Sequence, residues 1–218
     1  MSTEVLKAGN MGVNEKAQKN TAYRVRVIAS VGMLSAIAAV LMMFEFPLVF
    51  IAPSFYKLDF SEVPVLIGAF AFGPIAGIVI EFVKICLKLV MKGTFTFGVG
   101  ELGNFLIGCS LVVPASVIYS INKTRKGAVI GLITGTVVIT IAGVLLNAYL
   151  LLPFYAQFMG GIDALVAIGT GMHSAINSPL TFALLLVAPF NLVKGVLVSL
   201  ITMLLYKRIS RLIKGAGA

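Results

Sequence analysis

Four long apolar segments dominate this sequence. They cover residues 27–43, 102–121, 128–152 and 180–206. Each is close to or above the roughly 17 to 25 residues that a helix needs to cross about 30 Å of hydrocarbon. Because 59% of the residues are hydrophobic and only 11% are charged, the composition also differs from that of a soluble domain. The sequence therefore predicts an all-α integral membrane protein.

The segment 61–92 determines the number of spans. It is too long for one ordinary span and short for two, and Gly73-Pro74 in its middle is a turn or kink signal. Basic clusters lie at 7–26, 123–126 and 207–214, and such clusters mark cytoplasmic loops. All three lie on one side only if 61–92 forms two helices. We therefore predict a six-helix bundle with both termini in the cytoplasm.

The predicted membrane domain covers residues 24–214, between a polar cytoplasmic tail (1–23) and a short C-terminal tail (215–218). Its spans are expected at about 25–43, 61–73, 75–92, 101–121, 128–152 and 179–206. The segment 156–178 contains an apolar piece too short to cross, so we expect an outer loop with some helix. The long outer loops are suited to covering a site that loads from outside, although they could also simply connect helices.

Three polar residues fall inside predicted spans. Counting back from the cytoplasmic edge at about 1.5 Å per residue puts Lys194 about 20 Å deep, Asn191 about 24 Å and Asn147 about 30 Å. Asn191 and Lys194 share one helix face. Since an intramembrane charge is costly, these groups predict the floor of an outward-opening pocket. Amide and ammonium groups suit a ligand with carbonyl oxygens and ring nitrogens.

The alternative is structural: Lys194 pairs with a buried carboxylate, for which Glu101 is the nearest candidate, and the asparagines hydrogen-bond between helices. Two further acids, Asp59 and Glu62, bracket Ser61 at the start of the second helix. Capping of that helix is sufficient to explain both.

Glu81, Lys84, Lys88 and Lys92 form one stripe along the third helix. The spacing favours an internal pair of Glu81 with Lys84. Lys84 and Lys88 repel each other, which indicates either an acid elsewhere or a wet surface. Snorkelling of Lys88 and Lys92 to the interface is the alternative that needs no function.

The first span carries small residues at the spacing that lets helix backbones approach closely: Gly32 with Ala36, and Ser35 with Ala39. From spacing alone, this stripe fits packing inside the bundle as well as docking of another membrane protein.

Several classes of function are excluded. There is no phosphate-binding loop of the Gly-x-x-x-x-Gly-Lys-Ser/Thr type, so the chain does not hydrolyse ATP by that route. The single His173, with Cys86 and Cys109 in apolar segments, provides neither a zinc site nor a disulfide framework. No catalytic set falls at a suitable depth, so we predict no enzyme. The basic clusters fit membrane topology better than nucleic-acid binding.

Five motifs in order carry a family resemblance: 57–64 (KLDFSEVP), 68–77 with its Phe-Gly-Pro turn, 98–105 (GVGELGNF), 145–147 (LLN) and 189–195 (PFNLVKG). Together they resemble the riboflavin-specific S-component, the substrate-binding subunit of energy-coupling-factor (ECF) vitamin transporters. The resemblance runs from about Tyr23 to Lys214.

The resemblance implies a subunit of the bacterial plasma membrane that captures riboflavin from outside and delivers it with a transmembrane coupling subunit and two cytoplasmic ATPases. It implies no cofactor, and flavin mononucleotide (FMN) is a second candidate ligand. The implied substrate-binding residues are Asn147, Asn191 and Lys194 for the flavin ring, Tyr56, Leu58 and Asp59 at the lid 50–58 and its end, and Glu101 and Asn104 from the fourth span. The implied docking surface is Gly32, Ser35, Ala36 and Ala39.

The competing function is a stand-alone or ion-coupled membrane carrier for a small vitamin-like substrate. The absence of a mid-membrane carboxylate pair argues against it, although Glu81 keeps it open.

Overall fold

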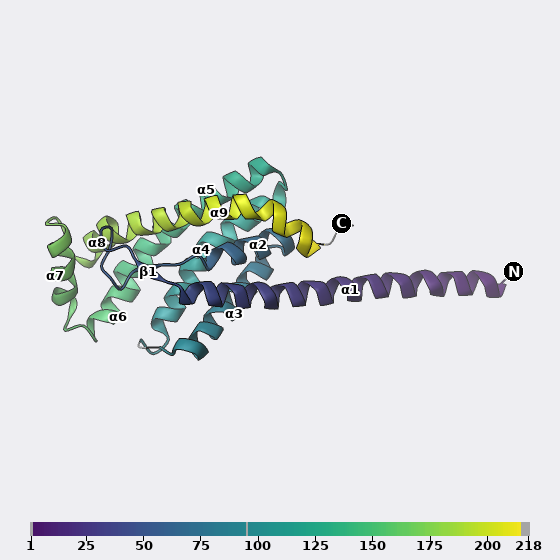
Figure 1. Cartoon of the computed structure of the whole chain (residues 1–218), viewed down its shortest axis with the longest axis horizontal. Coiled ribbons are helices and arrows are strands. Elements are labelled where there is room, and N and C mark those ends of the chain that lie inside the picture. Colours follow the sequence, from purple (N-terminus) through teal and green to yellow (C-terminus); the bar gives the residue numbers. More distant parts are fainter. Residues whose placement is uncertain (1, 95, 215–218) are drawn as a thin grey trace.

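The computed structural model describes residues 2–94 and 96–214, which form an elongated bundle of helices (Figure 1). The predicted C-terminal tail, 215–218, lies outside the described residues. In chain order the elements are α1 (Ser2–Met43), β1 (Phe46–Pro47), β2 (Lys57–Leu58), α2 (Glu62–Phe72), α3 (Pro74–Lys92), α4 (Val99–Ile121), α5 (Arg125–Leu146), η1 (Asn147–Leu151), α6 (Leu152–Ala156), α7 (Ile162–Met172), α8 (Pro179–Phe182), η2 (Ala183–Val187) and α9 (Ala188–Lys214). The η elements are single wide π turns inside otherwise continuous helices.

The predicted break at Gly73-Pro74 is confirmed. Gly73 has a φ of 100°, a conformation that favours glycine, and Pro74 begins α3, where its missing N–H is tolerated. The two helices are unequal, because α2 has 11 residues and α3 has 19. A helix as short as α2 extends only about 16 Å. Its first residues, Glu62 and Val63, are buried, so α2 begins inside the bundle.

Four helical segments of the described chain are long and apolar enough to cross a membrane: 20–43, 99–121, 125–156 and 179–206. Their outward faces are apolar. On α5, for example, Ile133, Val137 and Ile141 follow one another at a spacing of four and are 60%, 50% and 56% exposed. The charged side chains Glu81 and Lys84 are instead fully buried. This arrangement, apolar outside and charged inside, is that of a membrane protein.

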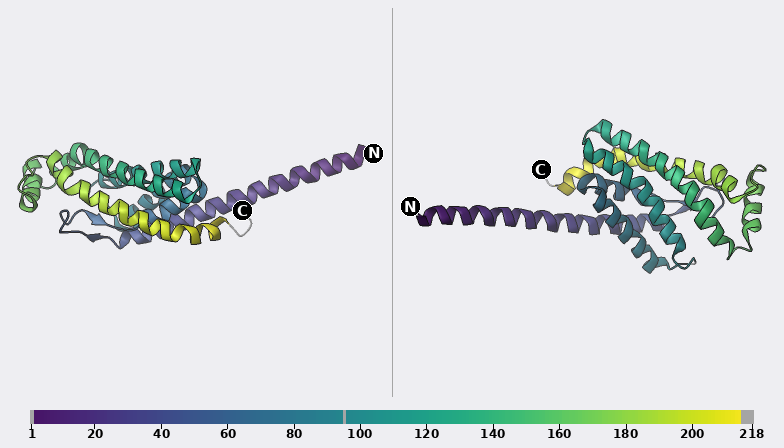
Figure 2. Two further views of the ribbon diagram at one scale, coloured as in Figure 1. Left: turned by 90° about the horizontal axis from the view of Figure 1, so that it is seen from above. Right: turned by 180° about the vertical axis from the view of Figure 1, so that it is seen from behind.

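The N-terminal part of α1 and the C-terminal part of α9 extend from the same end of the bundle, and α7 lies at the opposite end (Figure 1). Helix α1 includes most of the predicted N-terminal tail and projects well beyond the other helices in both views of Figure 2. Segment 156–178 contains the helix α7, which agrees with the helical part of the expectation for this segment.

The core has two parts. The first surrounds α2 and includes Leu66, Leu111 and Val198. The second is built around α8 and η2, where Phe182 packs with Leu58 of β2. Strand β2 pairs antiparallel with β1, with Phe46 opposite Leu58. The loop between α1 and α2 is thereby held against the second core.

Candidate substrate-binding site

Two adjoining cavities lie beneath the loop between α1 and α2. The outer cavity has a volume of about 440 Å³ and the inner cavity about 120 Å³. Both are lined by Phe55 and Lys57 from the loop, Gly100 and Asn104 from α4, and Tyr155 from α6. The larger volume is within the range of small-molecule sites.

The inner cavity brings together the three polar residues predicted to form a pocket floor. Asn147 begins η1, and Asn191 and Lys194 lie on α9. All three line this cavity, and they are only 1%, 3% and 8% exposed. The π turns lie next to them: η1 starts at Asn147, and η2 ends just before the helix that carries Asn191. Such turns occur frequently at functional sites.

Tyr56 connects the loop to this floor. Its hydroxyl donates a hydrogen bond to Oδ1 of Asn147 at 2.7 Å, and its ring packs against Phe182 and Phe190. Asn147 Nδ2 donates in turn to the carbonyl of Gly143 at 2.7 Å. Tyr56 therefore closes the inner cavity from the loop side.

Asn191 has an unsatisfied donor. Its Nδ2 atom is buried and has no hydrogen-bond partner among the described residues. A buried donor without an acceptor costs about 1 to 3 kcal/mol. Since Asn191 lines the inner cavity, a ligand acceptor there could recover this cost.

The structural alternative for Lys194 is confirmed in part: Lys194 pairs with a buried carboxylate, but the partner is Asp59 and not Glu101. Lys194 Nζ lies 3.2 Å from Oδ2 of Asp59 and 3.9 Å from Oε1 of Glu62. The reason is that α2 begins inside the bundle. Asp59 and Glu62, at its start, are therefore buried within reach of Lys194. Capping is therefore not a sufficient account of Asp59, although its Oδ1 also accepts the N–H of Ser61 at 2.8 Å.

A buried ionic cluster lies next to this pair. Lys84 Nζ is 2.7 Å from Oε1 of Glu81 and 3.0 Å from Oε1 of Glu62. This confirms the predicted pair within α3 and identifies Glu62 as the acid from elsewhere. The polar face of α3 is thus turned toward α2 and α4 rather than toward lipid.

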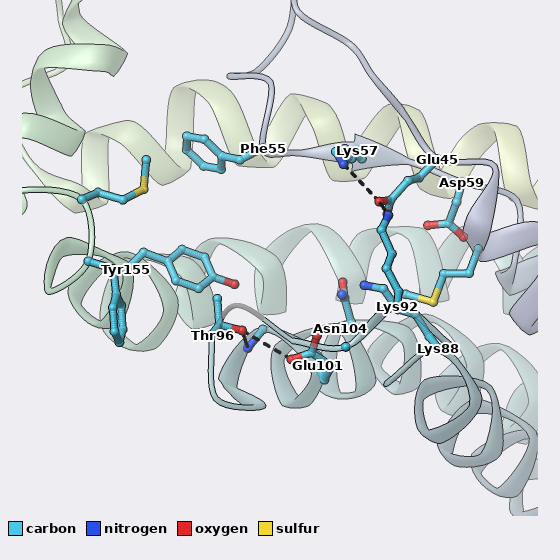
Figure 3. A pocket seen from close by; sticks show the side chains of 15 residues that line it. Glu45, Phe55, Lys57, Asp59, Lys88, Lys92, Thr96, Glu101, Asn104 and Tyr155 are labelled. Carbon is cyan, nitrogen blue, oxygen red and sulfur yellow. Dashed lines mark hydrogen bonds and ion pairs between the residues drawn. The ribbon is translucent and has the colours of Figure 1, made fainter. Parts of the chain in front are cut away.

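The outer cavity is lined by charged groups (Figure 3). Glu101 accepts hydrogen bonds from the hydroxyls of Thr94 at 2.8 Å and Thr96 at 3.3 Å, so it holds the α3–α4 connection. Asn104 points into the space between the α3–α4 connection and the loop that joins α1 to α2. Asp59 lies at the far side of this cavity.

Glu45 closes the rim of the outer cavity. It pairs with Lys57 of β2 at 3.1 Å and with Lys92 at the end of α3. Burial alone would raise the pKa of Glu45, but hydrogen bonds from Lys92 and Lys57 lower it below its ordinary value of 4.5. Glu45 therefore stays charged at neutral pH and connects three segments around the cavity.

We expect Glu45→Gln to accelerate ligand release at pH 7 by at most about fivefold, because exposed ion pairs contribute no more than about 1 kcal/mol. A carboxylate whose pKa is lowered by its ion pairs contributes stability at pH values above its ordinary pKa. This contribution is lost as the pH falls through the lowered pKa. The difference in release rate between the unchanged protein and Glu45→Gln should therefore shrink in acid below pH 4.5. Stopped-flow release measures it, and Asp163→Asn, an exposed acid on α7, controls for net charge. Release that is unchanged at pH 7 contradicts this role.

The remaining predicted site residues are distributed differently. Leu58 is buried in the second core and lines neither cavity. On α1, Gly32 and Ala36 are exposed, whereas Ser35 and Ala39 are buried. A partner therefore cannot reach Ser35 and Ala39 in this conformation, and the surface stripe is narrower than the spacing indicated.

Sequence reasoning missed four aromatic residues at the cavities: Phe55, Tyr155, Phe158 and Phe190. Phe190 lies within the motif 189–195, so that motif held a signal for it. Phe55 lies in the loop whose aromatic content suggested a cover. Nothing in the pattern around Tyr155 distinguishes it from other aromatic residues at a span end.

Comparison with known proteins identifies the family of this chain. The family model described as the ECF transporter substrate-specific component matches residues 26–206. This chain belongs to that family and is a multi-pass membrane protein.

Two curated relatives are close in sequence. The chain is 37% identical over 204 residues to the riboflavin transporter RibU of Staphylococcus aureus (strain TCH60), covering 93% of this chain and 99% of the relative. It is 33% identical over 184 residues to the riboflavin transporter FmnP of Bacillus subtilis (strain 168), covering 84% and 91%. A solved structure described as the S component of a bacterial ECF transporter superimposes with a TM-score of 0.68 at 35% identity, covering 88% of this chain and 99% of that one.

Proposed function

We propose that this chain is the riboflavin-binding subunit of an ATP-driven ECF vitamin importer. The observation that carries the proposal is the inner cavity, where Asn147, Asn191 and Lys194 converge and the amide nitrogen of Asn191 lacks an acceptor. The names of the curated relatives support riboflavin as the ligand.

The chemistry of the cavities fits a flavin. The ring system has carbonyl oxygens and ring nitrogens along one edge, which complement two amides and one ammonium group. The aromatic side chains of Phe55, Tyr155 and Phe190 provide faces for a flat ring. The polar groups of the outer cavity, such as Asn104 and Glu101, suit the hydroxyls of a sugar-alcohol chain.

FMN is a second candidate ligand. Lys57, Lys88 and Lys92 line the outer cavity, and ammonium groups attract a phosphate. Glu45 already engages two of them, so FMN should bind more weakly than riboflavin.

The proposed topology has six spans and cytoplasmic termini. Helices α2 and α3 are its second and third spans. Its support is that the N-terminal part of α1 and the C-terminal part of α9 extend from the end of the bundle opposite α7, together with the basic clusters in those parts. The proposed partners are a transmembrane coupling subunit and two cytoplasmic ATPases, since the chain has no phosphate-binding loop of its own. We expect the coupling subunit to contact Gly32 and Ala36.

Purification without partners tests the function. We expect a yellow protein whose bound flavin has the absorption spectrum of riboflavin after extraction. Transport of riboflavin into liposomes by this chain alone would overturn the subunit proposal and favour the stand-alone carrier. A folded protein that binds neither riboflavin nor FMN would overturn the ligand.

We expect Ala36→Leu to leave riboflavin binding intact and to abolish uptake by the full complex. Ala36 is exposed, so a larger side chain fits the isolated subunit, but it prevents close approach of a partner helix. Uptake of labelled riboflavin into cells measures the effect. Met33→Leu, an exposed and nearly isosteric change on α1, is the control. Normal uptake by the Ala36→Leu variant would show that the coupling subunit does not contact this face of α1.

The alternative of an ion-coupled carrier loses its main candidate. Glu81 is fully buried and paired with Lys84, and it lines neither cavity. A coupling carboxylate has to be reached by its ion, so nothing in this arrangement favours coupling.

A further inference from the structure

We propose that Gly143 on α5 is a positioning residue for both amide groups of the site, an inference that rests on the proposed function. Its missing side chain sets the place of the Asn191 amide, and its carbonyl oxygen sets the place of the Asn147 amide. Gly143 itself lines neither cavity.

The first contact is a close approach between helices. A Cβ atom at position 143 would lie 2.0 Å from Nδ2 and 3.0 Å from Cγ of Asn191. Real Cβ atoms do not approach other atoms this closely, so any side chain at 143 displaces the amide. Only glycine lets the amide of Asn191 lie against α5 while its residue lines the inner cavity.

The second contact is a shared acceptor. The carbonyl oxygen of Gly143 accepts the backbone N–H of Asn147 and also its Nδ2 at 2.7 Å. With Nδ2 held there, Oδ1 of Asn147 is the atom left to meet Tyr56. The orientation of Asn147 in the cavity therefore depends on Gly143, and one residue sets both amides from outside the cavity wall.

Gly143→Ala tests the first contact. We expect it to weaken riboflavin binding about 10- to 100-fold, because a displaced amide loses its polar contact with the ligand and an unmatched buried polar group reduces affinity by this much. In Asn191→Ala the clashing atoms are absent, so Gly143→Ala added to it should change affinity by less than about twofold. Affinities come from titration of flavin fluorescence. A full additional loss in the double variant would overturn the inference, because Gly143 would then act without Asn191.

A ligand-free measurement separates this inference from the proposed function. We expect Gly143→Ala to lower the thermal unfolding midpoint of the purified chain in detergent, and Asn191→Ala to restore it. Restoration supports the contact even if the ligand is not riboflavin. A midpoint that stays low in the double variant overturns it even if riboflavin binds.

Gly131→Ala is the matched control on the same helix. Its Cβ would lie 2.5 Å from the carbonyl oxygen of Ala115 on α4, and Gly131 lies about 18 Å along α5 from Gly143. We expect this variant to lower the unfolding midpoint without rescue by Asn191→Ala, and to leave the affinity of the folded fraction unchanged. Equal rescue of both variants would contradict a specific contact at 143.

Discussion

Lys84→Met is expected to destabilise the protein by about 3 to 5 kcal/mol, the usual cost of removing one partner from a buried ion pair. Lys84 contacts Glu62 and Glu81 at 3.0 and 2.7 Å, and all three side chains are almost completely buried. Methionine fills a similar volume but removes the cation that Glu81 contacts, and it leaves Glu62 with only the more distant Lys194 at 3.9 Å. Unfolding by denaturant in detergent micelles measures the loss.

Lys88→Met is the control for this effect. Lys88 lies one turn later on α3, is partly exposed and lines the outer cavity. Its replacement should change stability by no more than about 0.5 kcal/mol. Adding Glu81→Gln to Lys84→Met should recover part of the loss, because one unpaired charge is then absent. Equal stability of the Lys84 and Lys88 variants would show that the acids do not depend on Lys84.

Lys194→Met and Asn191→Ala are each expected to weaken riboflavin binding by about 1 to 3 kcal/mol, the cost of an unmatched buried polar group. Their effects on the empty protein should differ. Lys194→Met leaves Asp59, its partner at 3.2 Å, unpaired and lowers stability. Asn191→Ala removes a donor that already lacks a partner, so it leaves stability unchanged or slightly raised.

Flavin fluorescence titration and thermal unfolding, done on the same preparations, measure these two effects. Thr202→Val is the control, because Thr202 is a fully buried residue of α9 that lines neither cavity. It should not change affinity. Unchanged affinity in a folded Asn191 and Lys194 double variant would move the site away from the inner cavity.

The position of polar residues along their own helices could be predicted from the sequence. Counting residues put Asn147, Asn191 and Lys194 at similar depth, and they line one cavity. The pair of Glu81 with Lys84 followed from helical spacing alone. Both are local arguments, because the geometry of a single helix fixes the distances within it.

Contacts between helices were less predictable. The pairing of Lys194 with Asp59 joins residues 135 positions apart and depends on where α2 begins inside the bundle. The burial of Ser35 and Ala39 depends in the same way on which face of α1 meets its neighbours. The π turns before and at the site also left no pattern in the sequence, since they widen one turn without changing composition.

The first core around α2 has a consequence for an unpartnered copy of this chain in a membrane. Leu66, Leu111, Leu132 and Val198 belong to one buried apolar cluster, and none of them lines either cavity. Interiors of this kind are as dense as organic crystals, so water and ions meet an insulating layer there. We therefore expect idle copies of the subunit to conduct no ions and to leave the membrane potential of the cell intact.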